Sequence, residues 1–254
     1  IDEISQIEVG LWIQFQKLCF TGVKFILLGD FNQHFPIAGH IFAGQILDDE
    51  CIENSCMLKI MADCNRCTLT ECKRSDQKLF DFYSSIIFGG CRFDIPLDKL
   101  LEESRKLFPR KKGFPDCSLV ISHKMRNRIN SKQNEDTKPT CAVEINGADG
   151  KMWLFPGLRM VGYLQEKARG VVNQGYYEIL EIFDNEVKLL CEASKRELLV
   201  PMDFVKAHLR LCYAITVASC QGSTIRGRLR VYSAHPCFTK RNLFVCASRA
   251  ISFS

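Results

Sequence analysis

The sequence predicts an α/β fold built on parallel sheets, with a small antiparallel β module inserted in its second half. Three observations lead to this prediction. Residues 1–28 have the pattern of a strand, a helix and a second strand, which is how a parallel sheet begins. Residues 141–205 change to short runs of alternating polarity, as in antiparallel sheets. Residues 206–254 return to the first pattern, so the β module interrupts a parallel-sheet domain.

The first helix is expected over Ser5–Cys19, with Ser5 as its N-cap. Its apolar residues recur at spacings of three and four, as on one face of a helix. These residues are Ile7, Leu11, Phe15 and Leu18. The following run, Lys24–Leu28, is almost continuously apolar, which predicts a parallel strand covered on both faces.

The middle of the chain predicts a second helix and a buried strand. Leu79, Phe82, Tyr83, Ile86 and Ile87 lie at helical spacing, and Gly89-Gly90 would end that helix. The short apolar run Ser118–Ile121 predicts a strand. The polar segment Ser131–Thr140 has no periodicity and predicts a boundary.

The β module and the last part of the chain complete the pattern. The alternating runs Tyr176–Ile182 and Glu186–Leu190 flank Asp184-Asn185 and predict a small, barrel-like antiparallel unit. Leu211–Val217 is again apolar, and the apolar run Leu243–Ala250 predicts a strand that carries an arginine.

Composition sets broad limits on the kind of protein. A chain of 254 residues, 46% of them apolar, can bury a large core in one to three small domains. The net charge of +5 is spread along the chain, so it permits an anionic partner without requiring one. Its 14 cysteines are scattered, and there is neither a secretion signal nor an apolar stretch of 18 residues. We therefore expect a reducing intracellular compartment and no membrane partner.

The only metal-like cysteine spacing is Cys64-Asn65-Arg66-Cys67, which has the CxxC spacing of a zinc knuckle. No second CxxC and no pair of histidines follows at the usual separation. The cysteines at 51, 56, 64, 67 and 72 are therefore expected to be buried or idle thiols rather than zinc ligands.

The carboxylates Asp2 and Glu3 come directly after the first expected strand, and Gln33 follows the second. At the end of a buried parallel strand, Asp2 can hold a hydrated Mg²⁺ that bridges two phosphates of a nucleotide. Glu3 can then act as the base for the attacking water, and Gln33 can sense the terminal phosphate. The alternative for an Asp-Glu pair is a helix start, where acids complement the helix dipole.

Two arginines have positions that suit a phosphate. Arg74 stands just ahead of the second helix, and Arg249 follows the run Leu243–Ser248. An arginine that faces a nucleotide between two domains neutralises charge on the transferred phosphoryl group. Taken alone, each of the two is equally well explained as a surface cation.

The sequence lacks the phosphate-binding loop G-x-x-x-x-G-K-[ST] that such a site requires. The nearest approach, Gly147–Lys151, has the wrong spacing. The chain also begins without methionine. We therefore expect it to be the downstream part of a larger protein.

These motifs together resemble the superfamily 1 DNA helicases, in particular the RecD-like, five-prime-to-three-prime branch. They fall in the order of motifs II to VI of that family and extend from the first residue to the last. The matching segments are Asp2–Ser5, Gly29–Gln33 with Pro36, Arg74, Thr216 with Gln221–Thr224, and Val245–Ala250.

The resemblance implies two RecA-like P-loop motor domains, the first one truncated, with an inserted SH3-like β-barrel. It assigns residues 1–60 to the first domain, 61–140 and 206–254 to the second, and 141–205 to the barrel. It also implies ATP and Mg²⁺ between the motor domains, single-stranded DNA and duplex junctions as partners, and an upstream P-loop half. In a eukaryote such a protein would be nuclear.

The same resemblance implies roles for individual residues. Asp2 would hold Mg²⁺ and Glu3 would activate water, while Gln33, Arg74 and Arg249 would act on the terminal phosphate. Gln221 and Gly222 would help to bind the nucleotide. The residues implied at the DNA are Ser122, His123, Thr216, Ser219 and Thr224.

This chain departs from the family pattern at three places. Ala218-Ser219 stands where family members have His and a basic residue, which weakens the DNA track. Ser122-His123 replaces Thr-Asn, and His34-Phe35 replaces Leu-Pro. The weakened motif supports one alternative to a helicase motor, a non-catalytic helicase remnant that only binds nucleic acid. A third hypothesis, a β-barrel interaction module joined to a cysteine-rich zinc platform, does not explain the ordered motifs.

Overall fold

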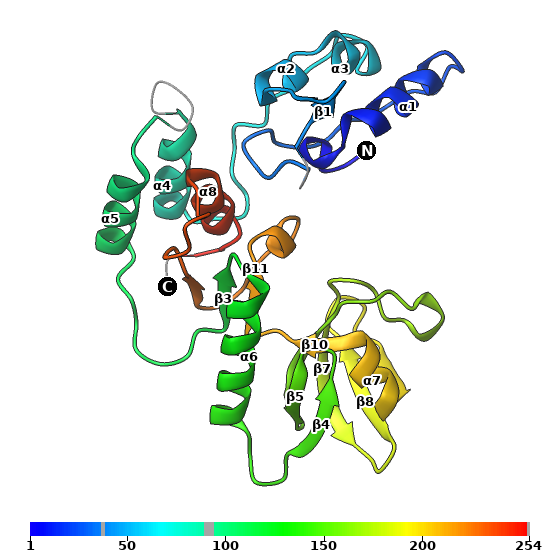
Figure 1. Ribbon diagram of the computed structural model, residues 1–254, viewed down its shortest axis with the longest axis vertical. Coiled ribbons are helices and arrows are strands. Elements are labelled where there is room, and N and C mark those ends of the chain that lie inside the picture. Colours follow the sequence, from blue (N-terminus) through cyan, green and yellow to red (C-terminus); the bar gives the residue numbers. More distant parts are fainter. Residues whose placement is uncertain (37–38, 89–93, 253–254) are drawn as a thin grey trace. The chain divides into compact units, whose positions relative to one another are not determined.

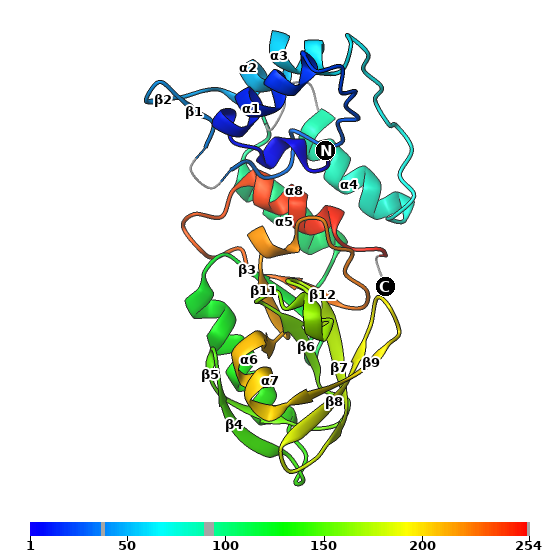
Figure 2. The same ribbon diagram turned by 90° about the vertical axis from the view of Figure 1, so that its right-hand side faces the viewer.

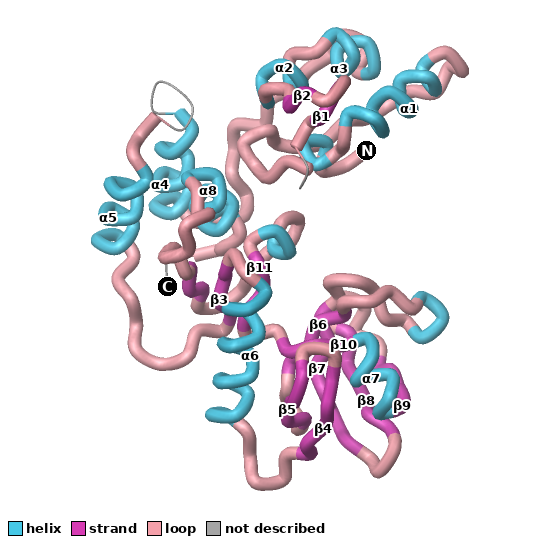
Figure 3. Tube along the Cα trace, in the orientation of Figure 1, coloured by secondary structure: helices cyan, strands magenta, loops and turns pink. Residues whose placement is uncertain are grey.

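The computed structural model describes residues 1–36, 39–88 and 94–252, which form two compact units. The first unit comprises residues 1–109, 221–224 and 238–254, and the second comprises residues 110–220 and 225–237. Helices predominate in the first unit and strands in the second (Figure 3). None of the described helices combines the length and apolar character needed to cross a membrane.

The N-terminal part of the first unit is a small helical layer (Figure 1). Its elements are η1 (Ile4–Gln6), α1 (Val9–Cys19), β1 (Ile41–Phe42), β2 (Gln45–Ile46), α2 (Asp49–Glu53) and α3 (Cys56–Met61). They enclose a core in which Trp12 is completely buried. The core also contains Ile4, Val9, Phe31, Ile52, Leu58 and Met61.

The predicted helix over Ser5–Cys19 begins later than expected. Glu8 is extended, at φ −66° and ψ 148°, and its carbonyl accepts the first helical bonds from Leu11 and Trp12. Ser5 is instead buried in η1, where its Oγ donates to the carbonyl of His34. The α1 face that enters the core carries Val9 and Trp12, and Phe15 packs partly buried beside them. The predicted Leu11 and Leu18 are exposed.

The predicted strand Lys24–Leu28 is wrong, since the described chain has no regular strand there. The segment is extended and pairs on one side with the N-terminus. Leu28 N donates to Ile1 O at 2.8 Å, and Ile4 N donates to Leu28 O at 3.0 Å. Alternate side chains point outward, so that Ile26 is 76% exposed. Among the described residues the segment has a backbone partner on one edge only, and it does not form the ladder that a buried parallel strand requires.

The remaining helices of the first unit are α4 (Gln77–Phe88), α5 (Leu97–Leu107) and α8 (Lys240–Ser248). The prediction of a helix over residues 79–87 is confirmed by α4, and its predicted Gly89-Gly90 stop lies outside the described residues. Helices α4 and α8 pack side by side (Figures 1 and 2). The rings of Tyr83 and Phe244 meet edge to face at 5.8 Å between centroids.

The predicted strand over Leu243–Ala250 is wrong, because α8 occupies this segment. Thr239 and Asn242 form a capping box that starts the helix. Helix α8 buries several consecutive apolar residues, among them Leu243 and Val245. A short run that is apolar on all sides fits a buried helix as well as a buried strand, so its periodicity alone does not discriminate between them.

The second unit contains a parallel sheet. Its central strand β3 (Cys117–Val120) confirms the strand predicted at Ser118–Ile121. It pairs in parallel with β11 (Ala214–Thr216) and β12 (Leu229–Val231), and the short helix η3 (Ala218–Cys220) follows β11.

Helix α6 (His123–Thr137) packs on this sheet, so most of the segment 131–140 that was predicted as a boundary is helical. The polar run has no apolar periodicity because α6 buries amides instead of aliphatic side chains. Asn130 and Asn134 are each only 1% exposed. Asn134 exchanges two hydrogen bonds with the backbone of Trp153, so burial does not leave its amide unpaired.

The β-rich region predicted from the sequence is confirmed. It contains the hairpin β4 (Val143–Gly147) and β5 (Gly150–Leu154), followed by an antiparallel sheet in the order β10-β6-β7-β8-β9. The sheet strands are β6 (Arg159–Gly162), β7 (Tyr176–Ile182), β8 (Glu186–Cys191), β9 (Glu197–Pro201) and β10 (Leu209–Leu211). Helices η2 (Lys167–Arg169) and α7 (Met202–His208) lie in its connections. Within the described chain, no pairing of β9 with β10 closes this sheet into a barrel.

Candidate functional site

Glu3 lies in an unusual backbone conformation in the first unit. Its φ of 53° and ψ of 46° are left-handed, which costs a non-glycine residue about 1 kcal/mol. The N-terminal segment is fixed by its bonds to residues 26–28, and the backbone N of Glu3 donates to Asp2 Oδ1 at 2.8 Å. Strain of this kind is found at functional sites more often than elsewhere.

The carboxylate of Glu3 meets the segment Gln221-Gly222, which lies far away in sequence but in the same unit. Gln221 Nε2 donates to Glu3 Oε2 at 2.9 Å. Gly222 has a φ of +77°, and a Cβ at this position would lie 3.6 Å from Glu3 Oε1. Glycine is favoured here by the left-handed φ, since 3.6 Å is an ordinary van der Waals distance that a Cβ could occupy.

A second contact joins Gln33 to Arg249. Arg249 is 2% exposed, and its Nη2 donates to Gln33 Oε1 at 3.2 Å. Gln33 Nε2 in turn donates to Asp30 Oδ2 at 3.3 Å. Asp30 also accepts from the backbone and the side chain of Asn32, so its carboxylate organises the turn that carries Gln33.

Arg74 and Arg249 are held by the same residue, Ser248. Arg74 Nη1 donates to the carbonyl of Ser248 at 3.0 Å, and Arg249 Nη2 donates to Ser248 Oγ at 3.1 Å. Ser75 Oγ adds a bond of 2.9 Å to the carbonyl of Ala250. The segment ahead of α4 is thus tied to the end of α8, and the two predicted phosphate-binding arginines come from one packed pair of helices.

The sequence prediction missed a cationic cluster around His34. Burial, followed by the charges of Arg241 and Arg249, lowers the pKa of His34 to about 4. Arg241 lies over the Phe35 ring, with its guanidinium carbon 3.8 Å from the ring centroid. His34 is therefore neutral at physiological pH, and the site keeps the two arginines without a third cation. Arg241 lies near the C-terminus and residues 33–35 near the N-terminus, so no local sequence pattern indicated this contact.

For Mg²⁺, the first unit offers the exposed carboxylate Asp2. No cluster of three His, Cys, Asp or Glu side chains able to hold a metal occurs among the residues that the structure describes. Mg²⁺ in nucleotide sites takes one or two carboxylates, with substrate phosphates and water as its other ligands. Asp2 fits this requirement. The exposed thiols of Cys64 and Cys67 belong to no such cluster in the described ranges, and the absence of zinc stays a prediction.

The residues predicted at DNA lie mainly in the second unit. Thr216 is 5% exposed, and its hydroxyl lies 2.7 Å from Ser219 Oγ within the β11–η3 turn. Ser122 caps α6 by accepting from Met125 N at 3.3 Å. Next to it, exposed His123 lies with Nδ1 2.9 Å from Nη1 of Arg126. Thr224 is exposed in the first unit. The DNA roles of these residues stay predictions.

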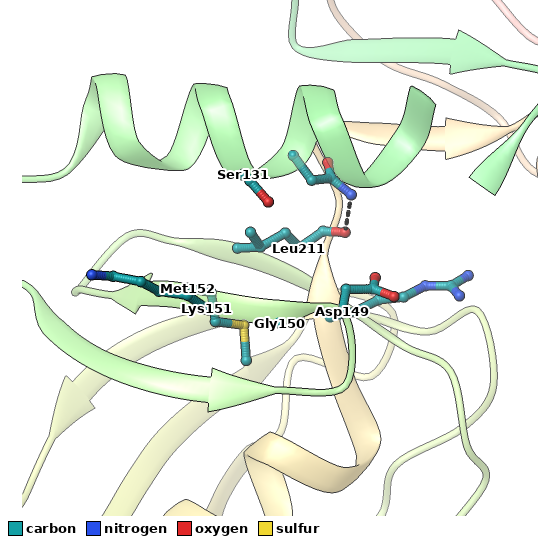
Figure 4. A pocket seen from close by; sticks show the side chains of 8 residues that line it. Ser131, Asp149, Gly150, Lys151, Met152 and Leu211 are labelled. Atoms are coloured by element: carbon teal, nitrogen blue, oxygen red, sulfur yellow. Dashed lines mark hydrogen bonds between the residues drawn. The ribbon is translucent and has the colours of Figure 1, made fainter. Parts of the chain in front are cut away.

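A small cavity lies between α6 and the β4–β5 hairpin of the second unit (Figure 4). Its volume is about 10 Å³, which is enough for one water molecule and too small for a nucleotide or a base. Residues that line it include Asn130, Asp149 and Arg210. Asp149 also forms an ion pair with the buried Arg126, with 2.7 Å between Oδ1 and Nη2. This cavity is part of the packing of α6 and not a ligand site.

Comparison with solved structures identifies the fold. The structure of a Pif1 helicase from Candida albicans is similar, with a TM-score of 0.68 and 17% identity. The superposition covers 100% of this chain and 70% of the Candida protein's chain. The chain has the fold of the Pif1 helicases. Pif1 from Bacteroides in complex with ADP-AlF3 and ssDNA also matches, with a TM-score of 0.64 and 18% identity over 100% of this chain and 70% of that one.

A further Pif1 structure, of two coordinating helicases that unwind forked dsDNA, has a TM-score of 0.66 and 15% identity, and covers 100% of this chain and 68% of its own. No protein-family model matches the sequence, and no curated protein matches it either. At identities of 15–18%, these similarities establish the fold and not the function.

Proposed function

We propose that this chain is the downstream part of an ATP-dependent DNA helicase of superfamily 1, in the RecD-like branch. What supports the proposal most is the pair of contacts Glu3–Gln221 and Gln33–Arg249. Both join predicted nucleotide-site residues that are about 200 positions apart, at sequence separations of 218 and 216. Residues without a shared site would not be expected to form both of these contacts.

In the proposed reaction, a water oxygen attacks the γ-phosphorus of ATP while the bond to the ADP oxygen breaks. Glu3 accepts one proton of that water. Arg249 and Arg74 neutralise charge that develops on the phosphoryl oxygens, and Gln33 detects whether the γ-phosphate is present. Gly222 lets the turn beside Gln221 approach the reacting groups. Asp2 would hold Mg²⁺, which supplies charge neutralisation at the phosphates when it is bound.

We further propose single-stranded DNA and duplex junctions as the partners. One neighbouring Pif1 structure is bound to ssDNA, and another concerns DNA unwinding at forked dsDNA, which supports this class of ligand. The proposed contacts are those implied by the sequence motifs, with Ser122, His123, Thr216, Ser219 and Thr224 along the strand. In this proposal the five-stranded antiparallel sheet and its hairpin correspond to the SH3-like insertion of the second motor domain.

An upstream segment with a phosphate-binding loop would complete the site. The sequence contains no such loop, and the N-terminal layer of the first unit exposes several large apolar side chains. This set comprises Leu11, Leu18, Phe20, Val23, Ile26 and Leu28, of which Phe20 is 87% exposed. Large exposed apolar surfaces mark positions that another element covers. We propose that the upstream half of the first motor domain packs here.

A non-catalytic remnant that only binds nucleic acid is the second candidate. The observation that favours it is the weakened motif around Ala218 and Ser219, together with the inward position of the Thr216 hydroxyl. Such a protein would keep the fold and lose turnover.

The deciding experiment measures DNA-stimulated ATP hydrolysis by the 254-residue chain and by the protein extended upstream through its phosphate-binding loop. We expect no hydrolysis by the shorter chain, because the missing loop provides most phosphate binding. The extended protein should hydrolyse ATP, and Glu3→Gln should abolish this activity. Activity of the shorter chain that is lost in Glu3→Gln would contradict the need for an upstream half. An inactive extended protein that still binds single-stranded DNA would favour the remnant.

A further inference from the structure

Gln221 has one side-chain atom that the contacts described so far do not use. Its Nε2 donates to Glu3, whereas its Oε1 is buried and has no hydrogen-bond partner within the described part of the chain. The whole residue is 8% exposed. A buried acceptor without a partner is unfavourable, so its retention beside a reactive carboxylate indicates that something else donates to it.

The orientation of the Gln221 amide follows from the chemistry of its neighbour. A carboxylate can only accept hydrogen bonds, and therefore Nε2 must face Glu3 Oε2. This fixes Oε1 on the other side of the amide carbon. A rotated amide would place two acceptors against each other and leave a donor buried instead.

Gln33, the other glutamine of the site, is not equivalent. Its Oε1 accepts from Arg249 at 3.2 Å and its Nε2 donates to Asp30 at 3.3 Å, so both ends of its amide are engaged. Of these two glutamines, only Gln221 combines a contact to Glu3 with an unused acceptor.

We propose that Gln221 is a catalytic residue that orients the attacking water, with Oε1 accepting one of the hydrogen bonds that the water donates. The inference rests on the proposed function, since it concerns the water that attacks ATP. Nε2 holds the Glu3 carboxylate in the position where it accepts the second proton of the same water. The water oxygen then bonds to the γ-phosphorus as ADP leaves, one proton passes to Glu3, and Gln221 neither gains nor loses a proton.

The first test uses the 254-residue chain without nucleotide. The side-chain amide resonances of Gln221 are identified by NMR through their loss in Gln221→Met. We expect Glu3→Ala to shift these resonances and to speed their exchange with solvent, because the carboxylate acceptor is removed. Resonances that do not change in Glu3→Ala would overturn the pairing on which the inference depends.

The second test uses the protein extended upstream and compares wild type, Gln221→Met, Glu3→Gln and the double variant. Methionine has nearly the same shape as glutamine but offers no amide. Gln221→Met should lower kcat on the order of a hundredfold and leave the affinity for a non-hydrolysable ATP analogue within a few-fold. Because both residues act on one water, the double variant should be no slower than Glu3→Gln. The matched control is Gln165→Met, at an exposed glutamine of the second unit, which should keep wild-type kcat.

The outcomes separate the inference from the proposed function. An active wild type with unchanged kcat in Gln221→Met would overturn the inference alone. A loss of analogue affinity without a loss of kcat, or strictly multiplicative losses in the double variant, would also overturn it, since Gln221 would then act on ground-state binding or independently of Glu3. An extended wild type without ATP hydrolysis would refute the proposed function and the inference with it.

Discussion

Replacing Asn130 by alanine should destabilise the second unit strongly. Asn130 projects from α6 to the chain that crosses from β10 to β11, and it makes three hydrogen bonds there. Its Nδ2 donates to the carbonyls of Leu211 at 3.0 Å and Ala214 at 3.2 Å, and its Oδ1 accepts from Ala214 N at 2.7 Å. Because the residue is 1% exposed, water cannot replace these partners without entering the core.

The magnitude follows from these contacts. A buried donor such as the Ala214 N–H costs about 1–3 kcal/mol when it loses its acceptor, and each further lost bond costs about 0.5–1.5 kcal/mol. Asn130→Ala should therefore lower the free energy of unfolding by about 3 kcal/mol. The matched control is Lys132→Ala, an exposed position of the same helix, which should change it by less than about 0.5 kcal/mol.

The assay uses the position of the two tryptophans, since Trp12 belongs to the first unit and Trp153 to the second. In a Trp12→Phe background, the fluorescence of Trp153 reports urea unfolding of the second unit alone. Equal unfolding midpoints for Asn130→Ala and Lys132→Ala would refute the reasoning, because the three hydrogen bonds would then contribute nothing beyond what water supplies.

Three more predictions concern the first unit. In the extended protein, Arg249→Ala should lower ATP turnover on the order of a thousandfold and leave nucleotide affinity within a few-fold. Arg249→Lys should restore little turnover, and Arg74→Ala should also lower it. Unchanged turnover in Arg249→Ala would mean that Arg249 is an ordinary structural arginine. Purified protein should carry no stoichiometric zinc, and elemental analysis that finds one zinc per chain, lost in Cys64→Ser, would show the opposite. Burial, together with Arg241 and Arg249, lowers the pKa of His34 in the folded chain to about 4. Between about pH 6.5 and pH 4, His34 is therefore protonated in the unfolded chain and neutral in the folded chain. The free energy of unfolding of the first unit should therefore fall as pH falls through that window, and it should fall less in His34→Gln. The measurement is urea unfolding at pH 7 and pH 4.5, followed by Trp12 fluorescence in a Trp153→Phe background. Equal losses in both proteins would contradict the assignment.

The sequence was most informative where local periodicity and burial agree. Helix α4 and strand β3 follow from their patterns, because an amphipathic helix and a short buried strand each have one favourable local interpretation. The change to alternating runs likewise located the antiparallel strands β7 and β8. The order of the short motifs led to the helicase resemblance, and the fold comparisons agree with that class of fold.

Two strand predictions failed and one polar segment is helical, each for an identifiable reason. Leu243–Ala250 is apolar on every face, and only its capping box and its packing against α4 make it the helix α8. Ser131–Thr137 is polar because α6 buries amides, whose partners come from segments distant in sequence. Lys24–Leu28 has the composition of a central strand, but within the described chain it pairs on one edge only.

The sequence by itself determined which residue types are available for phosphate chemistry and in what order they occur along the chain. Its motifs contain Glu3, Gln33, Arg74, Gln221 and Arg249. Only the tertiary structure decided that Glu3 pairs with Gln221, and Gln33 with Arg249. A hydrogen bond requires two atoms to lie about 3 Å apart, and the path of a chain through more than 200 intervening residues is set by packing rather than by local pattern. For the same reason the unused acceptor of Gln221, which depends on what lies around it in space, is a property of the folded protein alone.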